Sequence, residues 1–435
     1  MNNFSPRTGL LVKNIAASFF IKGWSAIVVL IMVPLTLKML GVYTNGVWLT
    51  ISGILMWIDF MDIGLGNGLR NAVAKYIATG DTGKVQVAVS STIFMLIIII
   101  IPVIFILSGI VQFFDIYGML GVEKDHVQNL DDILVVAITF SCVTFILKSV
   151  GNLYMGLQLP AVNNLILCLG QTLALILTFS AYLMGYCSLM TIVVINTLAP
   201  LTVWLLSIPY TFYYRYPQFR PTIRAINLRM SLTLCYNGIQ FFILQICSII
   251  LFASVNILIS RMFSPAEVTP YQIAYRYFSI ILTLFNIISM PFWNATTDAY
   301  TRGDINWIRK SSRKLNMVIG CIFITLVLMV VISPVCYRLW VGDDVVIPIE
   351  LSISTALYVF VLMVSLRYSY MLNGVNALRI QLIFTIGSTV VFLPLAWFVC
   401  SRFNTVTSLV LTMCFINLPG LVANAWKYYK IFYKK

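Results

Sequence analysis

The sequence predicts an all-α polytopic membrane protein of about twelve transmembrane helices, on the evidence of its composition and its charge pattern. Of its 435 residues, 60% are hydrophobic and only 10% are charged, whereas a soluble domain carries about 25% charged residues. The charges are also clustered, because none lies between Lys84 and Asp115 or between Lys148 and Arg215. A helix needs about 20 mostly apolar residues to cross a bilayer. Lipid is therefore the expected surroundings of this chain.

The apolar runs are expected to be helices. Inside hydrocarbon, backbone polar groups need partners within the protein, which leaves helices or a closed barrel. Barrel strands alternate polar and apolar residues, whereas the run IFMLIIIIIPVIFILSGI at 93–110 does not alternate. The first run has no small-residue cleavage site, so we expect a retained helix rather than a signal peptide. The predicted spans are 10–37, 44–65, 85–113, 132–156, 162–184, 190–213, 231–260, 270–293, 315–339, 351–373, 379–400 and 405–426.

The charges between the spans predict the orientation. If the N-terminus is inside, the cytoplasmic segments and span ends hold 19 of the 28 basic residues, and the opposite side holds five. One loop on the opposite side gathers acids, namely Asp115, Glu123, Asp125, Asp131 and Asp132. Because basic residues stay preferentially in the cytoplasm, we expect both termini there.

A weak internal repeat divides the spans six and six. At an offset of 223 residues, Asn14 aligns with Asn237, Lys38 with Arg261, and the pair Gly80-Asp81 with Gly303-Asp304. An even number of spans keeps both halves in the same orientation, related by an axis along the membrane normal. Such repeats are typical of transporters, which handle substrate between the halves. We therefore predict two pseudo-symmetric six-helix lobes, at 1–222 and 223–435.

The remaining four basic residues, Lys22, Lys148, Arg276 and Arg367, lie within predicted spans. A charge at bilayer depth costs about 3 kcal/mol on insertion scales, and it persists where it faces a protein-lined cavity. The alternative is that the long side chains reach the interface or pair structurally. Acids inside the spans are limited to Asp59 and Asp62. The expected cavity is therefore net positive and suits an anion such as a phosphate or diphosphate.

Other chemistry is not indicated. The nine cysteines form no C-x-x-C pair and His126 is the single histidine, so no histidine-based metal or catalytic cluster is expected. All loops are short, which leaves no room for a soluble catalytic or nucleotide-binding domain. The +14 net charge sits between apolar runs and indicates topology rather than nucleic-acid binding. The stretch DIGLGNGLRN at 62–71 places Asp62 near Arg70, which predicts a structural lock or a gating contact.

The block from Pro34 to Asn71 is similar to the N-terminal signature of Wzx-type O-antigen flippases, which belong to the MOP exporter superfamily together with MATE drug exporters. The matching elements are Pro34, Leu40-Gly41, Gly46-x-Trp48, Asp62-x-Gly64-x-Gly66-Asn67 and Arg70-Asn71, with Ser90-Ser91 at the start of the third helix. The resemblance implies a two-lobed, twelve-helix fold in a bacterial cytoplasmic (inner) membrane. It also implies a cationic cavity for an undecaprenyl-diphosphate-linked oligosaccharide, such as an O-antigen unit of lipopolysaccharide.

The predicted function is therefore a flippase that moves this lipid-linked oligosaccharide to the outer leaflet by alternating access. The predicted substrate-binding residues are Lys22, Arg276, Lys148 and Arg367, and the predicted gating or structural residues are Asp62, Arg70, Asn71 and Asp59. Expected partners are the cargo, membrane lipid and polysaccharide assembly proteins. No cofactor or enzymatic activity is expected, and coupling to protons or sodium ions is compatible with the resemblance.

Two alternatives stay open. An ion-coupled exporter of small molecules would use the same fold, but it would need intramembrane acids, of which only Asp59 and Asp62 are available. A membrane polysaccharide polymerase or glycosyltransferase would need a larger external loop or an acidic catalytic motif than the segment 114–131 offers.

Overall fold

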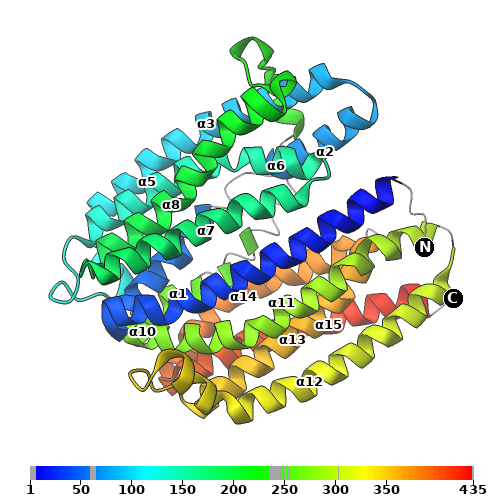
Figure 1. Ribbon diagram of the computed structural model, residues 1–435. Helices are drawn as coiled ribbons and strands as arrows, with labels where there is room; N and C mark the ends of the chain where they lie inside the picture. Colours follow the sequence, from blue (N-terminus) through cyan, green and yellow to red (C-terminus); the bar gives the residue numbers. More distant parts are fainter. Residues whose placement is uncertain are drawn as a thin grey trace. The chain divides into compact units, whose positions relative to one another are not determined.

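The computed structural model describes residues 6–58, 65–234, 246–247, 250–251, 254–301, 303–375 and 377–433. All regular secondary structure in these ranges is helical (Figure 1). The chain folds as two compact units, Met1–Ile246 and Cys247–Lys435. The predicted all-α fold is confirmed, while the lobe boundary at 222 and the count of six spans per lobe stay predictions.

Unit 1 is built around a long first helix that packs against α7. Helix α8 packs against α7 and α5, and α3 packs against α5. The elements are α1 (Pro6–Ile58), α2 (Leu65–Ala78), α3 (Thr82–Phe113), α4 (Ile116–Leu120), α5 (Leu130–Leu147), α6 (Ser149–Gly156), α7 (Pro160–Leu183), α8 (Leu189–Pro209), η1 (Tyr210–Arg215), η2 (Pro217–Phe219) and η3 (Ile223–Ala225).

Unit 2 is built around α13, which packs against α11, α12 and α15, and α14 packs against α15. Most of α13 is buried against these neighbours, whereas Ile353 and Leu357 are exposed. The elements are α10 (Ser254–Met262), α11 (Pro265–Thr301), α12 (Ile305–Val341), α13 (Ile349–Gly374), α14 (Leu378–Phe403) and α15 (Val406–Phe432).

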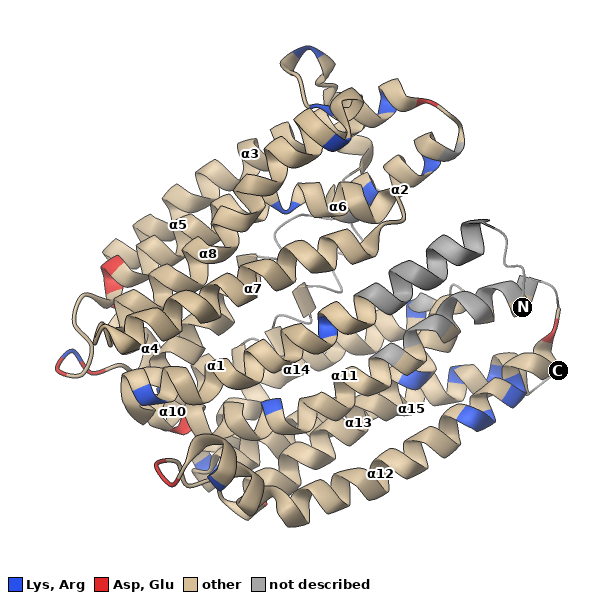
Figure 2. Ribbon diagram, in the orientation of Figure 1, with Lys and Arg blue, Asp and Glu red and all other residues tan. Residues whose placement is uncertain are grey.

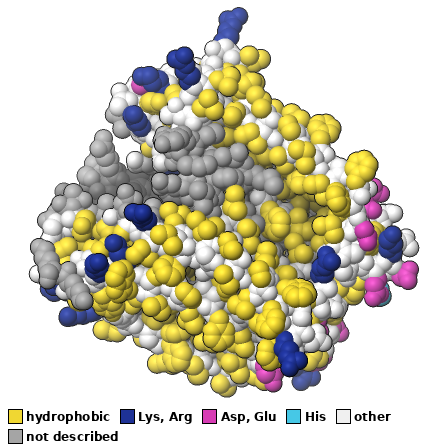
Figure 3. All heavy atoms as spheres, turned by 180° about the vertical axis from the view of Figure 1, so that it is seen from behind, with side chains coloured by type: hydrophobic (Ala, Val, Ile, Leu, Met, Phe, Trp, Pro, Cys, Tyr) yellow, Lys and Arg dark blue, Asp and Glu magenta, His cyan; other side chains and the backbone are white. Residues whose placement is uncertain are grey.

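The helices suit a membrane. Nine helical stretches among the described residues are long and apolar enough to cross one. Large apolar side chains such as Phe105, Leu183 and Val331 are exposed, and hydrophobic side chains cover much of the visible surface (Figure 3). Water would disfavour such a surface, so the chain is a multi-pass membrane protein.

Several predicted boundaries change. Two predicted spans run together in α1, where Gly41 (φ 71°, ψ 174°) breaks the helix. The fourth span is interrupted at Lys148, between α5 and α6. The segments 66–84 and 294–314, expected as loops, are largely helical. Most of the seventh span, 231–260, lies outside the described residues.

The internal repeat is visible as one turn formed twice. Gly80 and Gly303 have φ values of 73° and 75°, a region that favours glycine. Each following aspartate caps the next helix: the Asp81 side chain accepts from the Lys84 amide, and the Asp304 side chain from the Trp307 amide. Helices α3 and α12 begin 223 residues apart, and so do the ends of α2 and α11. The offset found in the sequence is therefore the structural offset of the two units at this turn.

Candidate functional site

Lys22 lies on the first half of α1, within an apolar helix, and its side chain is exposed on unit 1. Two residues further on, the Trp24 indole Nε1 donates to the Thr172 hydroxyl at 3.1 Å, which ties this part of α1 to α7. Lys22 itself makes no ion pair or hydrogen bond with the described side chains. It is therefore a cation without an observed partner on an apolar helix that is held by its neighbour.

Arg276 is half-buried on α11 and likewise has no side-chain partner among the described residues. It belongs to a polar stripe, which we define as Gln272, Arg276, Ser279, Thr283 and Asn286. At 3.6 residues per turn these positions share an arc of about 80° on the helix surface. A polar face along a membrane helix must meet protein or water rather than lipid.

The two ends of the stripe are held by neighbouring helices. The Gln272 amide nitrogen donates to Asn256 Oδ1 on α10 at 2.7 Å. The Tyr370 hydroxyl of α13 donates to Asn286 Oδ1 at 3.0 Å. Between these ends, Thr283 is exposed. The stripe thus presents a guanidinium, amides and hydroxyls in one row. The sequence analysis did not identify it as a stripe, although helical spacing would have revealed it.

Arg367 is enclosed within unit 2. Its side chain is only 3% exposed, and its Nη2 donates to Ser312 Oγ of α12 at 2.5 Å. The guanidinium lies over the rings of Tyr368, at 4.4 Å, and Tyr428 of α15, at 5.8 Å. Its Nε is buried and has no hydrogen-bond partner in the described part of the chain. Aromatic faces attract a cation, so tyrosines stabilise this charge where α12, α13 and α15 meet, and the side chain does not reach the surface.

The other predicted residues occupy more varied positions. Lys148 is half-buried at the break between α5 and α6. Arg70 and Asn71 are exposed on α2, whereas Asp59 and Asp62 lie outside the described residues, so the predicted lock between Asp62 and Arg70 stays a prediction. The role of the four span cations as a binding site therefore stays a prediction.

Glycines explain part of the signature around Arg70. A Cβ on Gly68 would lie 2.7 Å from the Leu234 carbonyl oxygen. A Cβ on Gly156 would lie 2.7 Å from Val73 Cβ and 2.8 Å from the Arg70 carbonyl oxygen. Real Cβ atoms do not approach so closely, so α2 packs on its neighbours by backbone contact.

The Ser90-Ser91 pair holds the segment that follows η1. The Thr222 amide donates to Ser90 Oγ at 3.1 Å, and the Asn227 amide donates to Ser91 Oγ at 2.9 Å. The Gln86 side chain reinforces them by donating to the Arg220 carbonyl at 2.8 Å. These bonds fix residues 220–227 on the start of α3.

Charges separate along each unit. Figure 2 shows Lys and Arg around α2 and the start of α3 in unit 1, and Asp and Glu around α4 and the start of α5. In unit 2, Lys and Arg gather at the start of α12 and the end of α15. Arg309 Nε donates to the Phe432 carbonyl at 2.7 Å, which joins these two helix ends. Basic and acidic ends are thus separated in unit 1, and the orientation that the charges predict stays a prediction.

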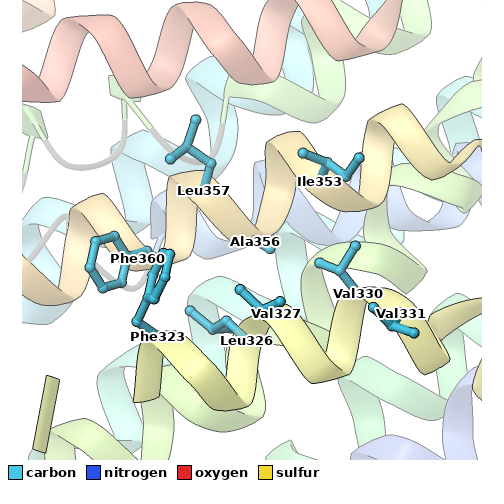
Figure 4. Close-up of a pocket in the computed structure, with 9 residues that line it drawn as sticks. All are labelled: Phe323, Leu326, Val327, Val330, Val331, Ile353, Ala356, Leu357 and Phe360. Carbon is cyan, nitrogen blue, oxygen red and sulfur yellow. The ribbon is translucent and has the colours of Figure 1, made fainter. Parts of the chain in front are cut away.

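Unit 2 also carries an apolar groove of about 300 Å³ between α12 and α13 (Figure 4). Phe323 and Phe360 close one end, with ring centroids 5.1 Å apart. The other lining residues are Leu326, Val327, Val330, Val331, Ile353, Ala356 and Leu357. No lining side chain could bind an anion, so the groove suits only hydrocarbon. Among the described residues, no group of three or more His, Cys, Asp and Glu side chains could hold a metal ion.

Comparison with known proteins then assigns the family. The family described as "Polysaccharide biosynthesis protein" matches residues 11–292, which is well over half of the chain. The chain belongs to this polysaccharide biosynthesis protein family. A curated relative from Salmonella typhimurium (strain LT2), described as "Putative O-antigen transporter", is 20% identical over 291 residues, covering 65% of this chain and 63% of the relative. The match thus spans less than two thirds of that relative.

Solved structures show which fold this family member has. An inward-facing multidrug resistance MATE family transporter of the MOP superfamily has a TM-score of 0.77 at 13% identity, covering 93% of this chain and 94% of its own. A MOP superfamily transporter from Pyrococcus furiosus, described as having a binding pocket of reversed polarity, has a TM-score of 0.61 at 14% identity, covering 94% and 96%. The polysaccharide biosynthesis protein therefore has the MATE fold of the MOP superfamily.

Proposed function

We propose that this protein moves an undecaprenyl-diphosphate-linked oligosaccharide from the cytoplasmic to the periplasmic leaflet of a bacterial inner membrane. The observation that carries the proposal is the set of membrane-depth cations, above all Lys22 and Arg276, which have no acidic partner among the described residues. An unpaired cation at this depth is costly. A diphosphate cargo would supply the missing negative charge through charge-assisted hydrogen bonds.

The polar stripe of α11 suits the rest of the cargo. Arg276 would contact the diphosphate, while Gln272, Thr283 and Asn286 offer the amides and hydroxyls that exchange hydrogen bonds with sugars. The prenyl chain would stay in lipid, where apolar surfaces such as the α12–α13 groove pose no barrier to it. No covalent bond changes, so the protein acts as a transporter and needs no catalytic residue.

Both the family and the fold support this proposal. The family is named for polysaccharide biosynthesis, and a curated relative is described as a "Putative O-antigen transporter". The fold is one on which MOP superfamily transporters are built. Transport would follow alternating access, in which a ligand shifts the balance between two conformations by binding one of them better. The basic ends of both units would face the cytoplasm, with both termini.

The test is surface polysaccharide in cells that carry Lys22→Ala or Arg276→Ala. We expect each variant to lower the amount at least tenfold, because loss of a charge-assisted bond of about 1.5–3 kcal/mol corresponds to roughly ten- to hundredfold. Lys22→Arg and Arg276→Lys keep the charge and should retain most of the activity. Full surface polysaccharide from both alanine variants, at normal membrane levels, would refute the cationic site.

A second candidate is favoured by the structural similarity to multidrug transporters, namely export of small organic cations. Exchange of cations would use an intramembrane acid, and the predicted spans offer only Asp59 and Asp62 beside the four cations. A strain lacking this protein should therefore show normal sensitivity to cationic dyes while losing surface polysaccharide. Raised sensitivity to cationic dyes with normal surface polysaccharide would favour export of small organic cations.

A further inference from the structure

Unit 1 contains a mixed polar and apolar pocket of about 440 Å³ at its acidic end, near α4 and the start of α5 and away from the basic residues around α2 (Figure 2). Four segments line it: α1 around Gly41, the α4–α5 loop, the start of α5 and the start of α8. The lining residues are Met39, Leu40, Thr44, His126, Val127, Gln128, Asn129, Ile133, Cys187, Ser188, Leu189 and Met190. This volume lies in the range of small-molecule sites.

The α4–α5 loop is held in place by α1. The Tyr43 ring stacks on His126 with centroids 4.5 Å apart, and the Glu123 amide donates to the Tyr43 hydroxyl at 2.9 Å. His126 Nδ1 in turn lies 3.0 Å from Glu123 Oε2. These three contacts fix one wall of the pocket on the helix break at Gly41. The wall is thus prebuilt rather than a loose loop.

Asn129 occupies an uncommon backbone conformation at this wall. It has φ 56° and ψ 37° and stands at the N-cap of α5, yet its side chain makes no capping hydrogen bond. An asparagine at an N-cap normally uses its side chain for that purpose. Asparagine is one of the few non-glycine residues that adopt left-handed backbone readily. The Asn129 side chain has no hydrogen-bond partner among the described residues and is exposed beside the exposed amide of Gln128, so both amides can contact a ligand.

The charge around the pocket argues against a phosphate ligand. Five acids, Asp115, Glu123, Asp125, Asp131 and Asp132, outnumber the two bases Lys38 and Lys124 in the neighbouring sequence. Their negative potential disfavours an anion. The pocket itself offers side-chain amides, hydroxyls and an imidazole over an apolar floor, and these groups can both donate and accept hydrogen bonds. A neutral, polyhydroxylated ligand satisfies this pattern.

We propose that this pocket binds the sugar end of the oligosaccharide at the outer face of unit 1, with Gln128 and Asn129 as the recognition residues. The placement at the outer face rests on the proposed function and orientation. The sugar end and the phosphate end of the cargo then meet different parts of the protein. Cations at membrane depth hold the phosphate, and a neutral amide pocket at the acidic end holds the sugar.

Cys187 provides a native reporter, because it lines the pocket and is exposed. The experiment measures its alkylation by a membrane-impermeant maleimide on the purified full-length protein, with Cys187→Ala to identify the signal. The probe is the oligosaccharide released by mild acid from the producing cell's own surface polysaccharide. A disaccharide absent from that polysaccharide serves as the comparator. With the probe at four times its dissociation constant, labelling of Cys187 should slow about fivefold. The comparator disaccharide should leave the labelling rate unchanged.

Asn129→Gly and Gln128→Ala should each reduce this protection below about twofold, because each removes one amide and raises the dissociation constant. Asn129→Gly keeps the left-handed backbone. Its matched control is Asn404→Gly, a left-handed asparagine at the end of α14 in unit 2, which should leave protection unchanged. If Asn129→Gly fails to fold, Gln128→Ala alone decides the result.

Equal labelling rates with and without the probe would overturn the proposal, and so would full protection in both amide variants. Protection by the comparator disaccharide to the same degree would also overturn it. None of these measurements requires transport. Normal surface polysaccharide in the Lys22 and Arg276 variants would therefore refute the proposed function. Protection of Cys187 from alkylation would still test sugar binding by the pocket independently.

Discussion

The two units share a backbone plan at the repeated turn but differ in the chemistry that it supports. Gly80-Asp81 and Gly303-Asp304 form the same left-handed turn and helix cap 223 residues apart. At the same offset, however, Gln272, Arg276 and Ser279 of the polar stripe correspond to Leu49, Gly53 and Met56 in α1. The scaffold is repeated while the polar face is found on one copy only. The shared backbone plan therefore does not require the polar face, which is compatible with the proposed contact between the stripe and the cargo.

A second contrast lies at the starts of α3 and α12. In unit 1 the uncharged Ser90 and Ser91 accept hydrogen bonds from the backbone of residues 222 and 227. In unit 2 the same positions are Arg313 and Lys314, which are exposed. The first helix start therefore anchors a connecting segment, and the second presents charge. The same helix position thus has a structural use in one unit and an electrostatic one in the other.

The largest effect on stability is expected where helices meet through glycine. Gly156→Ala in unit 1 should lower the free energy of unfolding by about 1–3 kcal/mol, because its Cβ would overlap Val73 and the Arg70 carbonyl. Gly320→Ala on α12 is the matched control in unit 2, since its Cβ would meet nothing within 4 Å. Thermal unfolding in detergent measures both. A Gly156→Ala protein as stable as Gly320→Ala would contradict the close packing of α2 on α6.

The polar stripe should be sensitive to loss of a single hydroxyl. Thr283→Val keeps the shape and should lower surface polysaccharide several-fold, by about 1 kcal/mol of binding free energy. Thr325→Val is the control, since Thr325 is an exposed membrane-helix threonine of the same unit, bonded to its own helix at the Cys321 carbonyl. Equal polysaccharide from the two variants would mean that the stripe does not contact the cargo.

The repeated turn should respond equally in both units. Gly80→Ala and Gly303→Ala each place a Cβ in the left-handed region, which costs roughly 1–2 kcal/mol. Neither Cβ would meet a neighbour within 4 Å, so the backbone term should account for the whole effect. Hydrogen exchange at the first turns of α3 and α12 measures it. A large change in one unit and none in the other would break the equivalence of the two turns.

The smallest effect is expected from pH. The Lys84 side chain and amide, both bonded to Asp81, hold the pKa of that carboxyl below its usual value of 3.8. Because the folded pKa is depressed, the stabilising contribution is present above about pH 4 and is lost as pH falls through the folded pKa. The counterpart of Lys84 is Trp307, so Asp304 lacks this partner. Lowering the pH below about 4 should therefore increase hydrogen exchange at the first turn of α3 more than at the first turn of α12 in the wild type. In Lys84→Met the two turns should respond equally.

Sequence patterns predict some of these features well. Long uncharged runs predict the helices, since hydrocarbon leaves the backbone few other choices. The two Gly-Asp pairs predict the repeated turn, because a left-handed glycine and an aspartate helix cap both depend only on neighbouring residues. The resemblance around Pro34–Asn71 predicts the family, which the match over residues 11–292 confirms.

Other features depend on contacts that local patterns do not contain. Arg367 is held by Ser312 and Tyr428, which are distant in sequence, so its enclosure could not be inferred from its position in a span. The bonds from Thr222 and Asn227 to the serine pair likewise join residues more than 130 positions apart. The polar stripe could have been found by helical spacing alone. The pocket at Gln128 and Asn129 needed the fold, because four separate segments form it.

The most direct test of the central claim is translocation by the purified protein in vesicles. The cargo is the undecaprenyl-diphosphate-linked oligosaccharide, and a membrane-impermeant glycosidase or lectin reports its arrival on the accessible leaflet. We predict rapid exposure with the wild-type protein, and exposure slowed at least about tenfold with Arg276→Ala but not with Arg276→Lys. Exposure at the rate of protein-free vesicles, or equal rates for Arg276→Ala and wild type, would contradict the account.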